Sequence, residues 1–218
     1  ESRPPLYYSF SHLTFHEYFT ARYVTQNTNH AALDDMVSRH VFDERWREVF
    51  ILTTSSLGDA SDFLKEIRAK IKSIHLSLNV KNILAKTGAL IDSKANYPLP
   101  LKRALALNGI LEQASRMESE TNLTQLVRAS ESLVNRIDDL YKNIDNLESV
   151  ALMTLQMGLS KNRDEIDRVA RKLALLDPSE QAQLTTYIKA SKLLIDCMSA
   201  DAIVSVATKR ELIESFLL

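Results

Sequence analysis

The sequence of 218 residues has few of the residues that build turns or cross-links, with four glycines, five prolines and one cysteine. Folds rich in β-strands need many tight turns, which glycine and proline commonly form, so this scarcity favours long helices. The single cysteine, Cys197, excludes a disulfide within the chain and is typical of a reducing compartment, so we expect a cytoplasmic protein. Its apolar surroundings in the sequence indicate a buried structural thiol.

Several signatures of enzymes and of membrane proteins are also missing. The sequence has no Gly-x-x-x-x-Gly-Lys-Ser/Thr phosphate loop, no Gly-x-Ser-x-Gly elbow and no Cys-x-x-Cys pair. No apolar run approaches the ~18–20 residues that span a bilayer. His12 and His16 are spaced like two metal ligands on one helix, but no third ligand lies near them in the sequence. We therefore expect no catalytic residue and no metal site.

Charge gives little indication of a nucleic-acid or membrane partner. The formal net charge is −1, so no global field attracts either of them. Lys65, Arg68, Lys70 and Lys72 lie on one side of the helix expected over residues 59–74, without interleaved aromatic residues. A solvated helix face is favoured over a nucleic-acid site there. The adjacent acids Asp34-Asp35 and Asp138-Asp139 are likewise expected to be solvated surface.

Periodic apolar residues and capping signals predict an all-α fold of about ten helices in antiparallel pairs, as an irregular bundle or a solenoid. At most a vestigial strand is expected, over residues 6–10. The Asp177-Pro178-Ser-Glu180 run is a strong helix start, and Ser199 is expected to open the last helix.

The polar breaks in the sequence divide it into three parts. These are 1–27 with the first helix, a helical domain over 28–117 and a C-terminal bundle over 118–218. Residues 126–151 carry a heptad pattern that fits either one long coiled-coil helix or two helices broken at 143–146. The break is favoured, because helices of ~10–14 residues are the norm.

One stretch, Tyr8 to Tyr23, carries six aromatic rings and two histidines. Thr14 and Glu17 form a capping box, so a helix is expected to start after Thr14. That helix gathers Phe15, Tyr18, Phe19 and Tyr23 near one face, which is expected to be core and to cover Trp46. His12 is left in the turn before the helix.

The run Phe10-Ser-His12-Leu-Thr-Phe15-His-Glu17-Tyr18-Phe19-Thr-Ala21 resembles a motif of NACHT-type NTPases. These belong to the STAND class, which includes NOD-like receptors and bacterial relatives. The motif lies at the end of their winged-helix domain and reads roughly Phe-x-His-x-Ser/Thr-Phe-Gln-Glu-Phe/Tyr-Phe-Ala-Ala, so His16 and Thr20 depart from it. Trp46-Arg-Glu-Val-Phe-Ile-Leu is similar to a downstream helix of bacterial members, and Tyr97-Pro98 with Arg103-Ala104 matches more weakly. The resemblance covers about residues 7–75, is faint to 117 and does not extend beyond.

The resemblance implies a non-catalytic regulatory segment, cut from a longer signalling ATPase of the bacterial type, since the chain starts at Glu1 almost within the motif. Its role would be to couple the nucleotide state to ligand sensing or autoinhibition, in innate immunity or anti-phage defence. In such proteins the histidine that corresponds to His12 contacts the phosphate of bound ADP. ATP or ADP is thus a cofactor of the intact protein only, and the partners are the upstream NACHT domain, a protein ligand and further copies on activation. The alternative is a stand-alone helical-repeat scaffold unrelated to NTPases.

Overall fold

The computed structural model describes residues 13–26, 31–90, 98–117, 121–145 and 163–214. Within these ranges the chain is all-α, as predicted, with ten α-helices, one 3-10 helix and no strand. The elements are α1 (Leu13–Gln26), α2 (Ala31–His40), η1 (Glu44–Trp46), α3 (Arg47–Ser56), α4 (Ser61–Lys72), α5 (Leu78–Ala89), α6 (Leu99–Met117), α7 (Thr121–Asp145), α9 (Arg163–Ala174), α10 (Pro178–Ser199) and α11 (Val206–Glu214). The strand expected over 6–10 lies outside the described residues.

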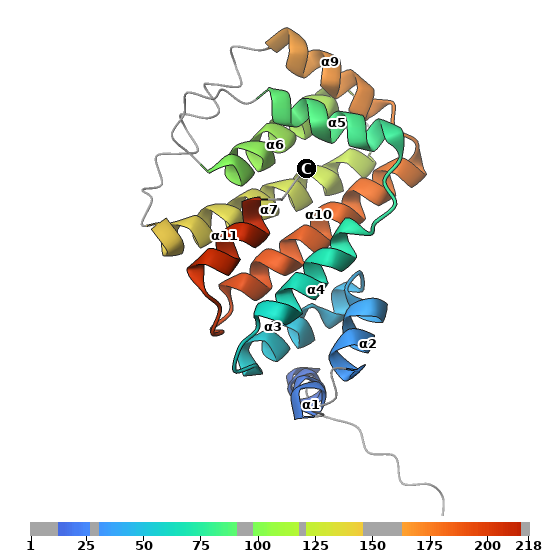
Figure 1. The fold of residues 1–218 in the computed structure, drawn as a ribbon. Coiled ribbons are helices and arrows are strands. Elements are labelled where there is room, and N and C mark those ends of the chain that lie inside the picture. Colours follow the sequence, from blue (N-terminus) through green and yellow to red (C-terminus); the bar gives the residue numbers. More distant parts are fainter. Residues whose placement is uncertain (1–12, 27–30, 91–97, 118–120, 146–162, 215–218) are drawn as a thin grey trace, which may run out of the picture.

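Helix α10 lies at the centre of the arrangement. It contacts α7, α4, α3 and α5, which come from widely separated parts of the chain, while α6 packs on α7 and α9 (Figure 1). In a solenoid each unit contacts only its neighbours along the chain. These contacts therefore favour the irregular bundle over the solenoid.

The start of α10 forms as its sequence predicts. The Asp177 carboxylate accepts a hydrogen bond from the Glu180 N–H at 2.8 Å, and the Glu180 side chain accepts one from the Asp177 N–H, which completes a capping box. Glu180 Oε1 also accepts hydrogen bonds from Ser77 Oγ at 2.8 Å and from Asn79 Nδ2 at 2.9 Å. Because Ser77 is itself the N-cap of α5, one glutamate ties the first turns of two helices together.

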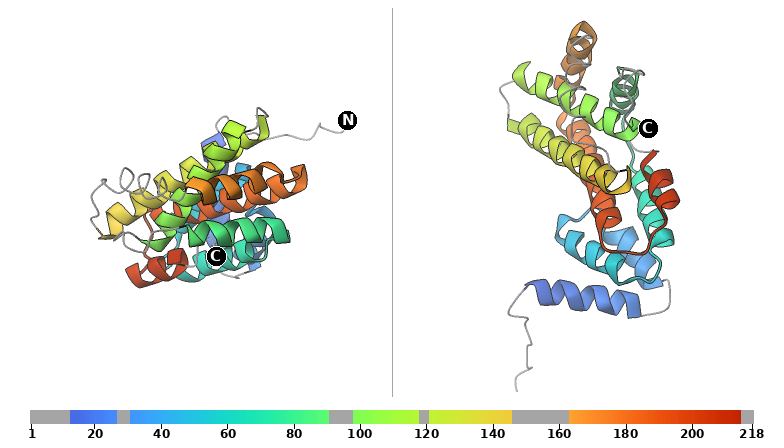
Figure 2. Two further views of the ribbon diagram at one scale, coloured as in Figure 1. Left: turned by 90° about the horizontal axis from the view of Figure 1, so that it is seen from above. Right: turned by 90° about the vertical axis from the view of Figure 1, so that its left-hand side faces the viewer.

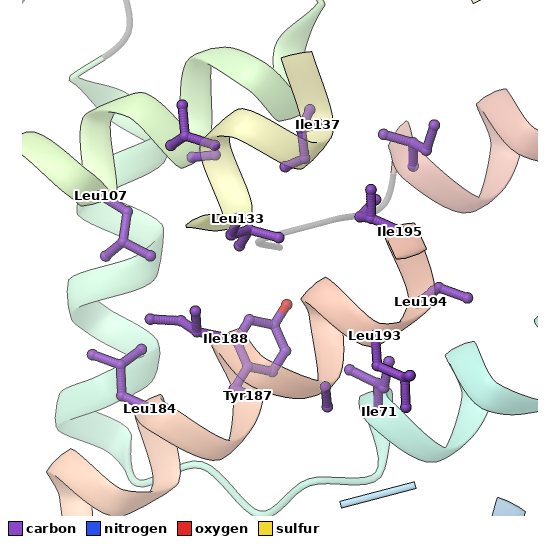
Figure 3. Packing of buried hydrophobic residues seen from close by; sticks show 14 of the residues in the cluster. Ile71, Leu107, Leu133, Ile137, Leu184, Tyr187, Ile188, Leu193, Leu194 and Ile195 are labelled. Atoms are coloured by element: carbon purple, nitrogen blue, oxygen red, sulfur yellow. The ribbon is translucent and has the colours of Figure 1, made fainter. Parts of the chain in front are cut away.

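The apolar faces of the helices meet in one hydrophobic cluster that surrounds α10. Figure 3 shows its centre, where residues of α10 meet residues of α6, α7 and α4: Leu184, Ile188 and Leu194 with Leu107, Leu133, Ile137 and Ile71. The heptad face of α7 is thus buried against α6 and α10. Helix α7 ends at Asp145, within the predicted break. The second helix expected after it lies outside the described residues, and the three-part domain division stays a prediction.

Ser199 does not open the last helix, contrary to the sequence prediction. It is the last residue of α10, where its hydroxyl donates to the Ile195 carbonyl at 2.9 Å, and the next residue, Ala200, is extended. The hydroxyl of Ser205 instead accepts a hydrogen bond from the Thr208 N–H at 3.0 Å and so caps α11. The chain between them is held beside the start of α4, since the Ala60 N–H donates to the Ile203 carbonyl at 3.3 Å.

Two charged residues that were expected on solvated faces are buried. Arg68 faces inward from α4 beside Tyr187 of α10, and burial lowers the pKa of its guanidinium while Tyr187 opposes that shift. Asp138 is buried because its carboxylate pairs with Lys142 Nζ at 2.6 Å, one helical turn further along α7. The basic face of α4 therefore consists of Lys65, Lys70 and Lys72, which weakens the case for a nucleic-acid site there.

Helix α1 lies across one end of the bundle (Figure 2), where it packs on α3 and less extensively on α2. Among the described helices, none combines the length and the apolar composition needed to cross a bilayer.

Candidate functional site

The aromatic side of α1 is exposed, so the prediction that it forms core is wrong. Between 46% and 67% of each of its four aromatic residues is accessible: Phe15, Tyr18, Phe19 and Tyr23. The residues of α1 that are buried are Ala21 and Val24. We call this exposed set the α1 aromatic face.

Packing geometry explains why the larger side chains of α1 are the exposed ones. A helix at the end of a bundle has neighbours on one side only, and small residues on that side let the two backbones approach closely. Ala21 and Val24 take that side, against α3. On the outer side, the rings of Tyr18 and Phe19 lie edge to face with centroids 5.5 Å apart. The sequence thus placed these rings on a common helix, but the smaller residues take the buried side.

His12, the predicted phosphate contact, lies outside the described residues. His16 is on α1 and exposed. In the ranges that the structure describes, no group of three histidine, cysteine or acidic side chains is arranged to hold a metal ion.

Trp46 is half-buried, and its main ring partner is His40. It ends the 3-10 helix η1, and its indole stacks on the His40 imidazole with centroids 3.7 Å apart and planes 6° from parallel. The Asp43 carboxylate caps η1 by accepting from the Arg45 N–H at 3.1 Å. Trp46 packs against the edge of the core, while the α1 aromatic face expected to cover it is turned to solvent.

A second surface feature is an open groove of about 1200 Å³ that sequence analysis did not identify. Its floor is one side of α10, and its walls are the first half of α7 and the corner over residues 39–47 that joins α2 to α3. We call it the α7–α10 groove. The floor carries small and apolar side chains, among them Ala182, Ala190 and Leu193.

One end of the groove is fixed by a buried acid between two arginines. The Asp196 side chain is 2% exposed, and its Oδ2 lies 2.9 Å from Arg47 Nη2 and 3.0 Å from Arg47 Nε. Its Oδ1 lies 3.1 Å from Arg136 Nε, although the angle does not make a hydrogen bond. This one carboxylate therefore joins α10 to the start of α3 and to α7.

The groove is more basic than the chain as a whole. Six cations line it against three carboxylates, whereas the whole chain has a formal charge of −1. The cations are Arg39, Arg45, Arg47, Arg128, Lys189 and Lys192, and the carboxylates are Asp43, Glu44 and Asp196.

Cys197 is fully buried, as predicted. Burial raises the pKa of its thiol to about 12, while contact with Thr54 opposes the shift. A thiol needs to ionise to act as a nucleophile, so Cys197 is inert near neutral pH.

Comparison with models of known families, with curated proteins and with solved structures finds no match for this chain. The sequence motifs, and the α1 aromatic face on which Phe15, Tyr18 and Phe19 lie, are therefore the features that bear on a NACHT-type origin.

Proposed function

We propose that the chain is a non-catalytic regulatory helical segment of a NACHT-type signalling NTPase. It docks through the α1 aromatic face on the upstream part of the same protein and couples the nucleotide state to ligand sensing or autoinhibition. The observation that carries this proposal is the exposure of that face, because it includes the motif residues Phe15, Tyr18 and Phe19.

The contrast between α1 and the rest of the bundle supports docking. The buried side chains of the other helices form one core cluster, while α1 adds only Ala21 and Val24 to it. Large contiguous apolar patches are uncommon on monomeric proteins and mark interaction sites, and aromatic residues are enriched at the centres of interfaces. A helix with its larger rings outward is arranged for such a contact.

The chemistry of the nucleotide belongs to the intact protein in this proposal. The sequence has no phosphate loop and Cys197 is inert, so this segment supplies no catalytic group. His12 contacts the ADP phosphate only when the upstream domain is present. The setting is a cytoplasmic immune or anti-phage system, and the partners are that domain, a protein ligand and further copies after activation.

The rival function is a stand-alone scaffold for protein interactions. An exposed aromatic face serves a foreign partner as well as an upstream domain, so the face alone does not separate the two. The central place of α10 argues against a repeat architecture, since α10 contacts helices from throughout the chain. A phosphate loop encoded upstream in the same reading frame supports the NACHT function, and an open reading frame without one supports the scaffold.

The decisive experiment measures ADP retention by the intact protein. Tyr18→Gln removes one ring of the α1 aromatic face, and His12→Ala removes the phosphate contact. His12→Ala is expected to speed ADP release about tenfold or more, since one charge-assisted hydrogen bond is worth about 1.5–3 kcal/mol. Tyr18→Gln is expected to speed ADP release because it removes apolar contact with the upstream domain. Leu175→Gln, at an exposed residue in the turn after α9, is the control. If both variants keep ADP like the parent, the proposed function is wrong.

The isolated segment gives a second test. It lacks a phosphate cradle, so isothermal titration is expected to detect no ATP binding. Micromolar affinity for ATP in the purified segment would contradict the proposal.

A further inference from the structure

We propose that the α7–α10 groove binds an acidic peptide segment in an extended conformation. This site is separate from the α1 aromatic face and does not depend on the NACHT resemblance. It rests on the shape of the groove and on the distribution of its charges.

Two of the six lining cations carry the charge that the groove leaves unneutralised. Four of them have a carboxylate partner: Arg39 with Asp35 at 2.6 Å, Arg45 with Asp43 at 2.7 Å, Arg47 with Asp196 at 2.9 Å and Lys189 with Glu44 at 2.9 Å. Among the described residues, Arg128 and Lys192 are in no ion pair, and both line the groove. Arg128 stands on the α7 wall and Lys192 on α10, so a ligand in the groove meets a positive charge from each helix.

The paired cations at the other wall are held in place. The Asp43 carboxylate fixes Arg45 through three contacts of 2.7 to 3.2 Å, and Asp196 anchors Arg47 from beneath. Arginine groups that are already oriented lose less side-chain freedom on binding than mobile ones. The corner over 39–47 thus presents two guanidinium groups that are already in ion pairs, Arg45 with 87% of its side chain exposed and Arg47 with 38%.

The dimensions and the floor fit a peptide. The lining of α10 runs from Pro178 to Asp196, which is about 27 Å along the helix at ~1.5 Å per residue. An extended peptide of about eight residues covers that length at ~3.3 Å per residue. Successive side chains of an extended peptide point to opposite sides. Such a peptide can therefore carry carboxylates on one side and apolar side chains on the other, which suits a groove that is lined both by cations and by apolar side chains such as Ala182, Ala190 and Leu193.

Nucleic acid fits the same groove less well. Single strands bind to grooves that combine positive charge with several aromatic platforms, and the lining contains one aromatic residue, Phe42. Asp43 and Glu44 also stand on the corner wall, where they oppose a continuous row of phosphates. A peptide can space its carboxylates to avoid them.

The test measures binding by fluorescence anisotropy with the whole chain. The probe is a fluorescein-labelled peptide of about eight residues with alternating Glu and Leu. The comparison probes are the same peptide with Gln in place of Glu, and a labelled oligothymidylate. We expect the Glu peptide to bind about tenfold or more tightly than either of the others, and we expect added salt to weaken it.

Matched charge reversals locate the binding. Arg128→Glu with Lys192→Glu is expected to weaken the Glu peptide about tenfold or more, because two attractive contacts become repulsive. The control is Arg171→Glu with Lys172→Glu, an equal charge change on exposed residues of α9 outside the groove. The control variant is expected to keep the parent affinity. Circular dichroism checks the fold, and the milder Arg128→Gln replaces the reversal if that variant does not fold.

Three results would overturn the proposal. They are equal affinity for the Glu and Gln peptides, tighter binding of the oligothymidylate, and equal losses in the groove variant and the α9 control. A failure here leaves the ADP-retention experiment untouched, since that experiment tests His12 and the α1 aromatic face, which are separate from the α7–α10 groove.

Discussion

Helices α1 and α10 are similarly apolar on average and similarly weak in amphipathic character, yet they occupy opposite situations. Twelve of the 22 residues of α10 are buried, against two of the 14 residues of α1. The difference comes from the neighbours of each helix. Helix α10 contacts α3, α4, α5 and α7, whereas the contacts of α1 are with α3 and α2.

The apolar content of a helix therefore does not decide by itself whether the helix is buried in the core. The apolar residues of α10 include Leu184, Ile188 and Leu194, which fit between several helices at once. The apolar residues of α1 are mostly bulky rings, and the side that packs on α3 is occupied by Ala21 and Val24. Substitutions in the two helices are therefore expected to have very different effects on stability.

The largest effect is expected for Leu194→Ala in α10. Leu194 is fully buried, and removing a buried leucine side chain costs about 2–5 kcal/mol of the ~5–15 kcal/mol that stabilises a domain. Urea denaturation followed by circular dichroism measures the loss. Leu175→Ala, at an exposed leucine in the turn between α9 and α10, is the control and should change the free energy of unfolding by less than about 0.5 kcal/mol. Similar losses in both variants would contradict the central position of α10.

A smaller effect is expected when Asp196 becomes Asn. The change keeps the shape of the side chain but removes the charge that holds Arg47 and Arg136. Both arginines are partly exposed, so water compensates for part of the loss, and we expect a cost of about 1–3 kcal/mol. The matched control is Asp35→Asn, which breaks the exposed pair with Arg39 and should cost at most about 1 kcal/mol. Equal costs would show that burial does not strengthen the Asp196 contacts.

Trp46→Ala ranks next and is expected to cost about 1–2 kcal/mol. A fully buried tryptophan would cost more, but this one is half-exposed and its main ring contact is the stack on His40. His40→Ala tests the same contact from the other side and should shift the fluorescence of Trp46, the single tryptophan of the chain. An unchanged emission spectrum in His40→Ala would contradict the stack.

The sequence predicted those parts of the fold that depend on local signals. The capping box of Asp177 and Glu180 is recognisable within one helical turn. What it did not predict depends on contacts between distant residues. Arg68 is buried beside Tyr187, where α4 packs on α10. The groove combines residues near positions 40, 128 and 190, which no local pattern connects. The exposure of the α1 aromatic face also depends on such a contact, because the position of α3 decides which side of α1 is buried.

The smallest effect on stability is expected for Tyr18→Gln on the α1 aromatic face. Glutamine is a better helix former than tyrosine, and about half of Tyr18 is exposed, so the free energy of unfolding should change by less than about 0.5 kcal/mol. The same variant should reduce any concentration-dependent self-association of the isolated segment, measured by sedimentation velocity, because exposed apolar patches promote association. The matched control is Ala21→Gln, on the buried side of the same helix, which overpacks the contact with α3 and should cost about 1–3 kcal/mol. A loss of about 2 kcal/mol or more in the Tyr18 variant would mean that this side chain stabilises the segment itself, and the aromatic face would then be part of its core and not a docking surface.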